Sequence, residues 1–210
     1  MKQQFNNRFK ALSIVNVMVM CLVFNIQAQT SVSYFESGNT KFDAKDYRGA
    51  IIDFSKAIEY NNYYVDAYML RGHCKSILLD FKGAVVDYTK ALEVDPKLSY
   101  VYFARAYAKR QLEDYRGALL DYNNYISIKP FDSKAYTNRG VVKYSLEDYQ
   151  GAIEDLTTAI ELDPNDMKAY YNRGLAKYAS GLVDSGCLDF SKAGELGDGN
   201  AYDLIRKYCK

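Results

Sequence analysis

The sequence is poor in the residues on which most enzymes and metal sites depend. Its 210 residues include one histidine, four cysteines, three prolines and no tryptophan. It has no metal-ligand spacing, no glycine-rich phosphate loop and no G-x-S-x-G turn for a nucleophilic serine. His73 and Cys74 are neighbours, but adjacent helical side chains point about 100° apart, which places them poorly as a nucleophilic pair. These absences argue against an enzyme, and no metal or other cofactor is expected.

The chain also lacks an excess of either charge. Its 27 basic and 26 acidic residues give a formal charge of +1. Residues 1–28 hold three of the basic residues and no acidic one, so their removal would leave 24 basic and 26 acidic residues, a charge of −2. A chain so close to neutral has no global charge with which to attract nucleic acid or an acidic membrane.

Residues 1–28 have the three-part pattern of a secretory signal peptide. They start with basic residues, continue with the mostly apolar segment 11–24, and end on the small residue Ala28, where a peptidase could cut. The basic residues are Lys2, Arg8 and Lys10. The sequence therefore predicts an exported protein, periplasmic or secreted.

Two other kinds of leader fit this segment less well. A membrane span needs about 20 apolar residues, so the segment 11–24 is short for an uncleaved anchor. Cys21 could accept a lipid, but Val19 and Met20 stand where lipoprotein signals have small residues. A cleaved signal peptide stays the favoured interpretation.

The rest of the chain repeats itself every 34 residues, without insertions. The five units are 31–64, 65–98, 99–132, 133–166 and 167–198. The fourth position of every unit is a tyrosine: Tyr34, Tyr68, Tyr102, Tyr136 and Tyr170. The eighth position is always small: Gly38, Gly72, Ala106, Gly140 and Gly174. Such a period predicts a stack of similar supersecondary units.

Each unit is predicted to form two short helices joined by a tight turn. In unit 133–166 the apolar residues of the second half recur at helical spacing: Ala152, Ile153, Leu156, Ala159 and Ile160. An aspartate at the turn of the first four units is placed to cap the second helix: Asp46, Asp80, Asp114 and Asp148. Small residues let the two helices approach closely. One such hairpin cannot bury enough surface alone, so the units must pack on each other.

The units resemble tetratricopeptide repeats over residues 31–198. They depart from the family pattern in having tyrosine instead of the frequent tryptophan at position 4, and Asn61-Asn62 where units two and four have Asp-Pro. The resemblance implies an all-α fold, a right-handed α-solenoid of antiparallel helix pairs, with first helices on the concave face. Residues 199–210, with Tyr202, Ile205 and Cys209 on one face, are predicted to form a C-terminal capping helix.

Cys187 and Cys209 are predicted to form a disulfide that holds this cap. Both lie 11 residues from the turn centre at Asp198, so two antiparallel helices would bring them opposite each other. Export would expose them to oxidising conditions. The alternative is two reduced, apolar fillers. Cys74 is expected between helices and His73 on the concave surface.

Arginine at position 7 and aspartate at position 23 predict a ladder of ion pairs between units. If each first helix packs on the second helix of the unit before, the pairs are Arg71–Asp53, Arg105–Asp87, Arg139–Asp121 and Arg173–Asp155. Ser37 replaces arginine in the first unit, which has no preceding aspartate. The alternative is that the arginines form an anion-binding row.

The family resemblance implies a ligand along the concave face, contacted by positions 2, 5, 9 and 12 of the first helices. Here the groove would comprise Phe35, Asn39, Phe42, Met69, His73, Tyr100, Phe103, Tyr107, Arg110, Thr137, Val141, Tyr144, Lys168, Tyr171 and Tyr178. So many aromatic side chains suit an extended peptide or a partner helix. Family members that bind a C-terminal carboxylate use a five-residue clamp, of which only Asn138 and Lys168 are present, so that ligand is not predicted.

The sequence therefore predicts a non-catalytic interaction scaffold of the cell envelope. Its partner would be another protein or a peptide, and neither nucleic acid nor a small-molecule substrate is expected. Two alternatives stay open. One is an accessory subunit of an envelope enzyme or assembly machine. The other is a module that self-associates through its N-terminal face, which has no obvious cap before Ser31.

Overall fold

The computed structural model describes the backbone of residues 2–209, and the side chains of Asn16 and of residues 18–209. The basic residues of the predicted leader and Lys210 of the predicted cap therefore lie outside the described side chains. The described part is all helical, as predicted. Its helices are α1 (Lys2–Asp43), α2 (Tyr47–Tyr60), α3 (Val65–Ile77), α4 (Phe81–Val94), α5 (Ser99–Gln111), α6 (Tyr115–Ile128), α7 (Ser133–Ser145), α8 (Tyr149–Leu162), α9 (Met167–Ala179), α10 (Val183–Glu195) and α11 (Gly199–Tyr208).

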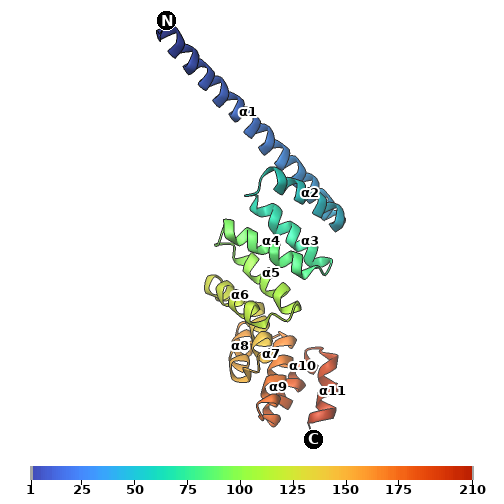
Figure 1. Cartoon of the computed structure of the whole chain (residues 1–210). Helices are drawn as coiled ribbons and strands as arrows, with labels where there is room; N and C mark the ends of the chain where they lie inside the picture. The colour runs from blue at the N-terminus through green and yellow to red at the C-terminus, as the bar shows by residue number, and fades with distance from the viewer. Residues whose placement is uncertain (1, 210) are drawn as a thin grey trace.

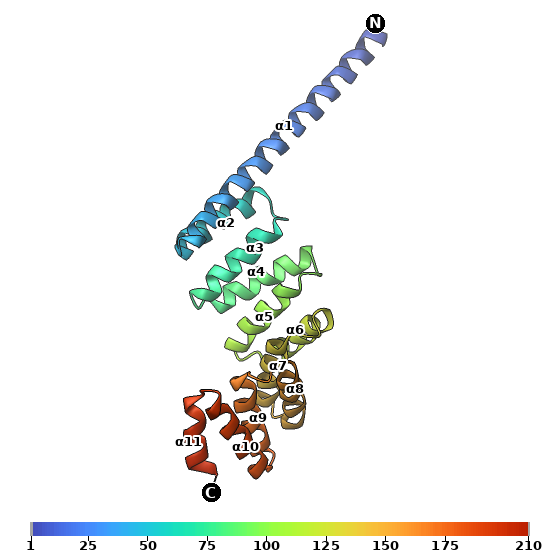
Figure 2. The same ribbon diagram turned by 180° about the vertical axis from the view of Figure 1, so that it is seen from behind.

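The helices form antiparallel pairs that stack in chain order (Figures 1 and 2). Each helix packs on the helices before and after it in the sequence, and the first helices of neighbouring units, such as α7 and α9, also touch. The two ends of the chain lie at opposite ends of the stack (Figure 1). The fold is therefore the predicted α-solenoid, in which side chains of successive first helices share one face.

Helix α1 runs without a break from the predicted leader into the first unit. Its N-terminal half extends away from the stack (Figure 1). The side chains of residues 18–29 are all exposed, and the first buried one is Ser31, whose hydroxyl donates to the carbonyl of Ala57 at 2.8 Å. Among the described side chains, packing thus begins where the first repeat begins. Within the described residues, no helix combines the length and apolar character that crossing a membrane requires.

The turn inside each unit has the predicted aspartate cap in units one to four. The carboxylate accepts from the backbone N–H three residues later, in the pairs Asp46–Gly49, Asp80–Gly83, Asp114–Gly117 and Asp148–Gly151. The residue before each cap is in the left-handed region, with φ between 60° and 64°: Lys45, Leu79, Glu113 and Glu147. In unit five Gly181 takes this conformation and Leu182 gives no side-chain cap.

The core of each unit is the contact between position 8 and position 24. The side chains at position 24 are fully buried or nearly so: Phe54, Tyr88, Tyr122, Leu156 and Phe190. A Cβ added to Gly140 would lie 2.7 Å from the Leu156 side chain. Alanine or glycine at position 8 is therefore what allows the two helices of a unit to approach.

Helix α11 has the features of the first helix of a unit, and we call residues 199–209 the half unit. Asp198 caps it through the N–H of Asn200, as Asp166 caps α9 through the N–H of Lys168. Ala201 is fully buried at position 3, like Ala169 in unit five. Tyr202, predicted on the packed face, is 50% exposed with its ring over Gly194, because Ala201 takes the closest approach.

A disulfide joins this half unit to α10. Cys187 and Cys209 are bonded, with their Cα atoms 5.7 Å apart. Cys209 stands at position 11 of the half unit, where every complete unit has a lysine that pairs with its own second helix. In this segment the disulfide thus takes the place of the lysine contact.

Candidate functional site

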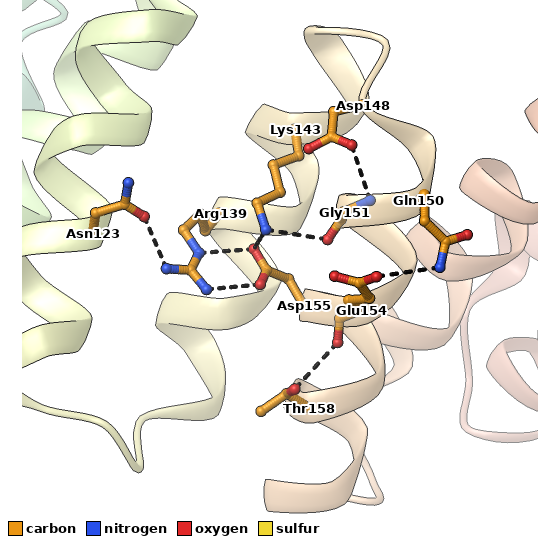
Figure 3. Close-up of polar contacts among 9 residues, drawn as sticks. All are labelled: Asn123, Arg139, Lys143, Asp148, Gln150, Gly151, Glu154, Asp155 and Thr158. Atoms are coloured by element: carbon orange, nitrogen blue, oxygen red, sulfur yellow. Dashed lines mark hydrogen bonds and ion pairs between the residues drawn. The ribbon is translucent and has the colours of Figure 1, made fainter.

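The repeated arginines pair with the aspartate of their own unit, not with that of the unit before. Nε and Nη2 of Arg139 donate to the two carboxylate oxygens of Asp155 at 2.8 and 2.7 Å (Figure 3). The same double contact joins Arg71–Asp87, Arg105–Asp121 and Arg173–Asp189. The predicted pairs Arg71–Asp53, Arg105–Asp87, Arg139–Asp121 and Arg173–Asp155 are therefore wrong. Position 23 lies on the side of the second helix that faces its own first helix.

The third nitrogen of each guanidinium makes the contact between units. Nη1 of Arg139 donates to Oδ1 of Asn123, at position 25 of the unit before, at 2.8 Å (Figure 3). The equivalent bonds are Arg71–Ser55, Arg105–Thr89 and Arg173–Thr157, at 3.0 to 3.1 Å. Each guanidinium also lies 5.4 to 5.8 Å from the ring centre of the tyrosine at position 4 of its unit. With all these contacts made, the arginines brace the solenoid and do not form an anion-binding row.

A lysine at position 11 also pairs with the position-23 aspartate of each unit. It recurs in all five units, but no role was predicted for it from the sequence. Nζ of Lys143 lies 3.0 Å from Asp155 (Figure 3). In unit one, Lys41 and the hydroxyl of Ser37 each reach Asp53 at 2.6 Å. Ser37 therefore keeps the aspartate hydrogen-bonded where arginine would find no preceding unit to contact.

Two cavities lie along the first helices and share Phe103. One, of about 340 Å³, lies between α3 and α5. The other, of about 490 Å³, lies between α5, α7 and α9. Of the predicted groove residues, His73, Tyr100, Phe103 and Tyr107 line the first cavity. Phe103, Arg110, Thr137, Val141 and Lys168 line the second. We call the two cavities together the central groove.

The remaining predicted residues line neither cavity. Four of the aromatic ones pack on aromatic neighbours: Phe35 on Phe54, Phe42 on Tyr47, Tyr144 on Tyr149 and Tyr171 on Phe190. Tyr178 packs on Tyr208 of the cap. Met69 packs against the core of unit two. Asn39 is half-buried in α1.

The first cavity is apolar apart from the imidazole of His73 and the hydroxyl groups of its serine and tyrosine side chains. His73 is half-buried with its ring centre 5.4 Å from that of Phe42, and burial lowers the pKa of this imidazole. The neutral form therefore dominates at pH 7. Cys74 is fully buried beneath it, and burial raises the pKa of the thiol to about 11. Cys74 thus lies in the core and His73 lines the cavity, which are the places predicted for them.

The second cavity carries three cations that make no ion pair with a described residue: Arg110, Lys134 and Lys168. The guanidinium carbon of Arg110 lies 5.4 Å from the ring centre of Tyr107. Its Nε is buried and has no hydrogen-bond partner among the described residues.

Two carboxylates also line the second cavity, but hydrogen bonds already occupy them. Asp166 accepts from the hydroxyl of Thr137 at 2.8 Å and from the backbone N–H of Lys168 at 3.0 Å. Asp163 accepts from the backbone N–H of Asn165 at 3.1 Å. Hydrogen bonds do not neutralise a carboxylate, so by formal charge the lining has three basic and two acidic side chains, an excess of one positive charge.

Two asparagines at position 6 face the second cavity. Nδ2 of Asn138 donates to the carbonyl of Lys134, and Nδ2 of Asn172 to that of Lys168, each at 2.7 Å. With the amide nitrogens held by their own helices, the Oδ1 atoms are left to accept hydrogen bonds. Asn138 was predicted only as an isolated member of a carboxylate clamp, and its recurrence at position 6 as Asn172 was the signal in the sequence for a different role.

Among the described residues, no cluster of three histidine, cysteine or acidic side chains is arranged to hold a metal ion.

Comparisons with known proteins agree with this repeat architecture. A family model described as tetratricopeptide repeat matches residues 65–98, and one described as TPR repeat matches residues 142–181. No curated protein matches the chain in sequence.

Solved structures of similar fold cover most of the chain. A MamA crystal structure is 23% identical with a TM-score of 0.77, over 87% of this chain and 97% of that one. YrrB, described as a TPR protein with an unusual peptide-binding site, is 18% identical with a TM-score of 0.78, over 84% and 92%. MamA of Desulfovibrio magneticus is 18% identical with a TM-score of 0.76, over 80% and 94%. Likeness at these identities establishes the fold, a TPR superhelix.

Proposed function

We propose that this chain of tetratricopeptide repeats is a non-catalytic scaffold that binds another protein through a peptide or helix in the central groove. The observation that carries the proposal is that two neighbouring cavities lie along the first helices and share Phe103 in their linings. Together they offer an apolar end and a polar end along α3, α5, α7 and α9. Repeat scaffolds of this kind are typically non-catalytic. Grooves of this shape, lined by tyrosine and phenylalanine, suit extended or helical segments.

The likeness to YrrB supports a peptide as the ligand class. That protein is described as having a peptide-binding site, and it shares the fold over 84% of this chain. The groove residues here differ in type from one unit to the next, which suits recognition of a defined segment.

We also propose that the protein works outside the cytoplasm after loss of residues 1–28. The exposure of residues 18–29 supports this, because their removal would take no buried side chain from the solenoid. The Cys187–Cys209 disulfide supports it as well, since such bonds persist in oxidising compartments. Mass spectrometry of the exported protein tests the idea. An intact N-terminus with both thiols free would refute it.

The groove is tested by peptide binding with the double variant Phe103→Ala/Tyr107→Ala. Fluorescence polarisation against a random library of end-blocked peptides should find ligands whose binding the double variant abolishes. Leu120→Ala is the matched control, because this side chain is 65% exposed on α6, away from both cavities. Ligands that bind the double variant and the wild type equally would reject the groove.

The two alternative functions, self-association and an accessory role in an enzyme complex, can each be tested by a separate measurement. Self-association through the N-terminal face would give a concentration-dependent mass in light scattering. An accessory role in an enzyme complex would appear as co-purification with an enzyme from the native envelope, lost in Phe103→Ala/Tyr107→Ala.

A further inference from the structure

The unpaired charges of the central groove indicate which charge its ligand should carry. Arg110, Lys134 and Lys168 have no ionic partner among the described residues, and they outnumber the two acidic side chains of the second cavity, Asp163 and Asp166. The position-7 arginines are excluded as ligand contacts, because the ion pairs inside each unit already use them. The second cavity therefore complements a negatively charged group.

Arg110 is the cation at the junction of the two cavities. It lines the second cavity, and its guanidinium lies on the ring of Tyr107, which lines the first. Its Nε is buried and lies away from solvent, so the terminal nitrogens of the guanidinium are the donors available to a ligand in the cavity. The contact with Tyr107 limits the rotamers of Arg110, so little further ordering is needed on binding.

The groove continues on both sides of Arg110. The helix of Arg110, α5, contacts both α3 and α7, so the first cavity, with His73 and Tyr100, lies toward α3, and the second, with Val141 and Met167, lies toward α7 and α9. A chain that places a carboxylate at Arg110 can therefore extend in both directions. The Oδ1 atoms of Asn138 and Asn172 can accept from its backbone N–H groups. This arrangement suits an internal acidic side chain rather than a chain terminus.

We propose that the central groove recognises an internal segment of an extended peptide in which an aspartate or glutamate binds Arg110 and a nearby apolar side chain fills the cavity lined by His73, Tyr100 and Tyr107. The proposal rests on the proposed peptide-binding function of the groove and specifies its ligand. The carboxylate would form charge-assisted hydrogen bonds with the guanidinium, and Lys134 and Lys168 would add longer-range attraction.

The test uses end-blocked, fluorescein-labelled peptides, each with one phenylalanine or leucine and one glutamate at varied separation, and each with a glutamine twin. At least one glutamate peptide should bind, and its twin should bind about 10- to 100-fold more weakly. Arg110→Gln should remove this difference, and Arg110→Lys should keep part of it. Arg116→Gln is the control, because this exposed side chain of α6 lines neither cavity. Thermal melting of each variant shows that it is folded.

Equal binding of glutamate and glutamine peptides would overturn the proposal, and so would a panel in which none binds. Binding only by peptides with a free C-terminal carboxylate would also overturn it, in favour of a terminal ligand. In the first and last cases, loss of binding in Phe103→Ala/Tyr107→Ala would still support the groove. Binding that this double variant leaves unchanged would reject the proposed function together with the proposal.

Discussion

Arg139 bridges two units with a single guanidinium. Two of its nitrogens donate to Asp155 in its own hairpin, and the third donates to Asn123 in the hairpin before. Both side chains of the ion pair are mostly buried, at 16% and 6% exposure. Arg139 therefore stabilises its own unit through Asp155 and the contact with the preceding unit through Asn123.

Replacing Arg139 with alanine should destabilise the solenoid by about 2 kcal/mol, because Asp155 stays buried with only Lys143 as a counter-charge. Urea unfolding followed by circular dichroism measures this. Arg116→Ala, on the exposed side of α6, should change stability by less than about 0.5 kcal/mol. An unchanged stability of Arg139→Ala together with lost peptide binding would return the arginines to a ligand-binding role.

Stability should fall in acid partly through Asp53. Burial acts to raise the pKa of this carboxyl, but hydrogen bonds from Lys41 and Ser37 outweigh it, so the pKa is lowered. A lowered folded pKa gives stability that is present above about pH 4, the unfolded value, and is lost as the pH falls through the folded pKa.

Ser37→Ala should reduce this acid-dependent part. Melting temperatures of wild type and variant, measured from pH 7 to pH 2, should differ most above pH 4 and converge in acid. A constant difference across the range would show that the hydroxyl does not stabilise the ionised carboxylate.

Loss of the Cys187–Cys209 bond should loosen the C-terminal half unit first. The bond closes a loop with a sequence separation of 22, and such a closure stabilises by about 3 kcal/mol. Cys209→Ser should therefore raise amide exchange in α11 while leaving α3 to α8 protected. Wild type treated with a reductant should match the variant. Equal protection of α11 in oxidised and reduced protein would refute this role.

Leu79→Gly should stabilise the protein by about 0.5 to 1 kcal/mol. Leu79 has φ 64°, a conformation that costs most side chains about 1 kcal/mol, and it is 73% exposed, so little packing is lost. Glu154→Gly, exposed in the middle of α8, should instead cost about 1 kcal/mol. Differential scanning calorimetry compares the two, and equal losses would contradict the prediction.

The sequence predicts the parts of the fold that depend on local chemistry. The 34-residue period and the turn aspartates are such parts, since Asp148 needs only the N–H of Gly151 to act as a cap. The pairing of Arg139 depends on which side of α8 faces α7, and the spacing of residues does not contain that information. For this reason the predicted partner, Asp121, was wrong although both residue types were right.

The half unit and the groove were predicted incompletely for different reasons. Unit five is two residues shorter than the others, which shifts the register, although Asp198 and Ala201 carried the repeat signature. In the groove, family positions alone could not separate cavity from core. Tyr144 packs on Tyr149 across the turn between α7 and α8, a contact that the groove position of Tyr144 does not reveal.

The bond from each arginine to the preceding unit also bears on the mechanics of the solenoid. Rotating one hairpin against the next would strain a guanidinium that is clamped at both ends, so twist and ion pairing are coupled. Only the acceptor in the preceding hairpin varies, as Ser55, Thr89, Asn123 and Thr157. Torsional stiffness, and with it the curvature that the groove presents, can therefore be adjusted at one position per unit without disturbing the pairs that hold each hairpin.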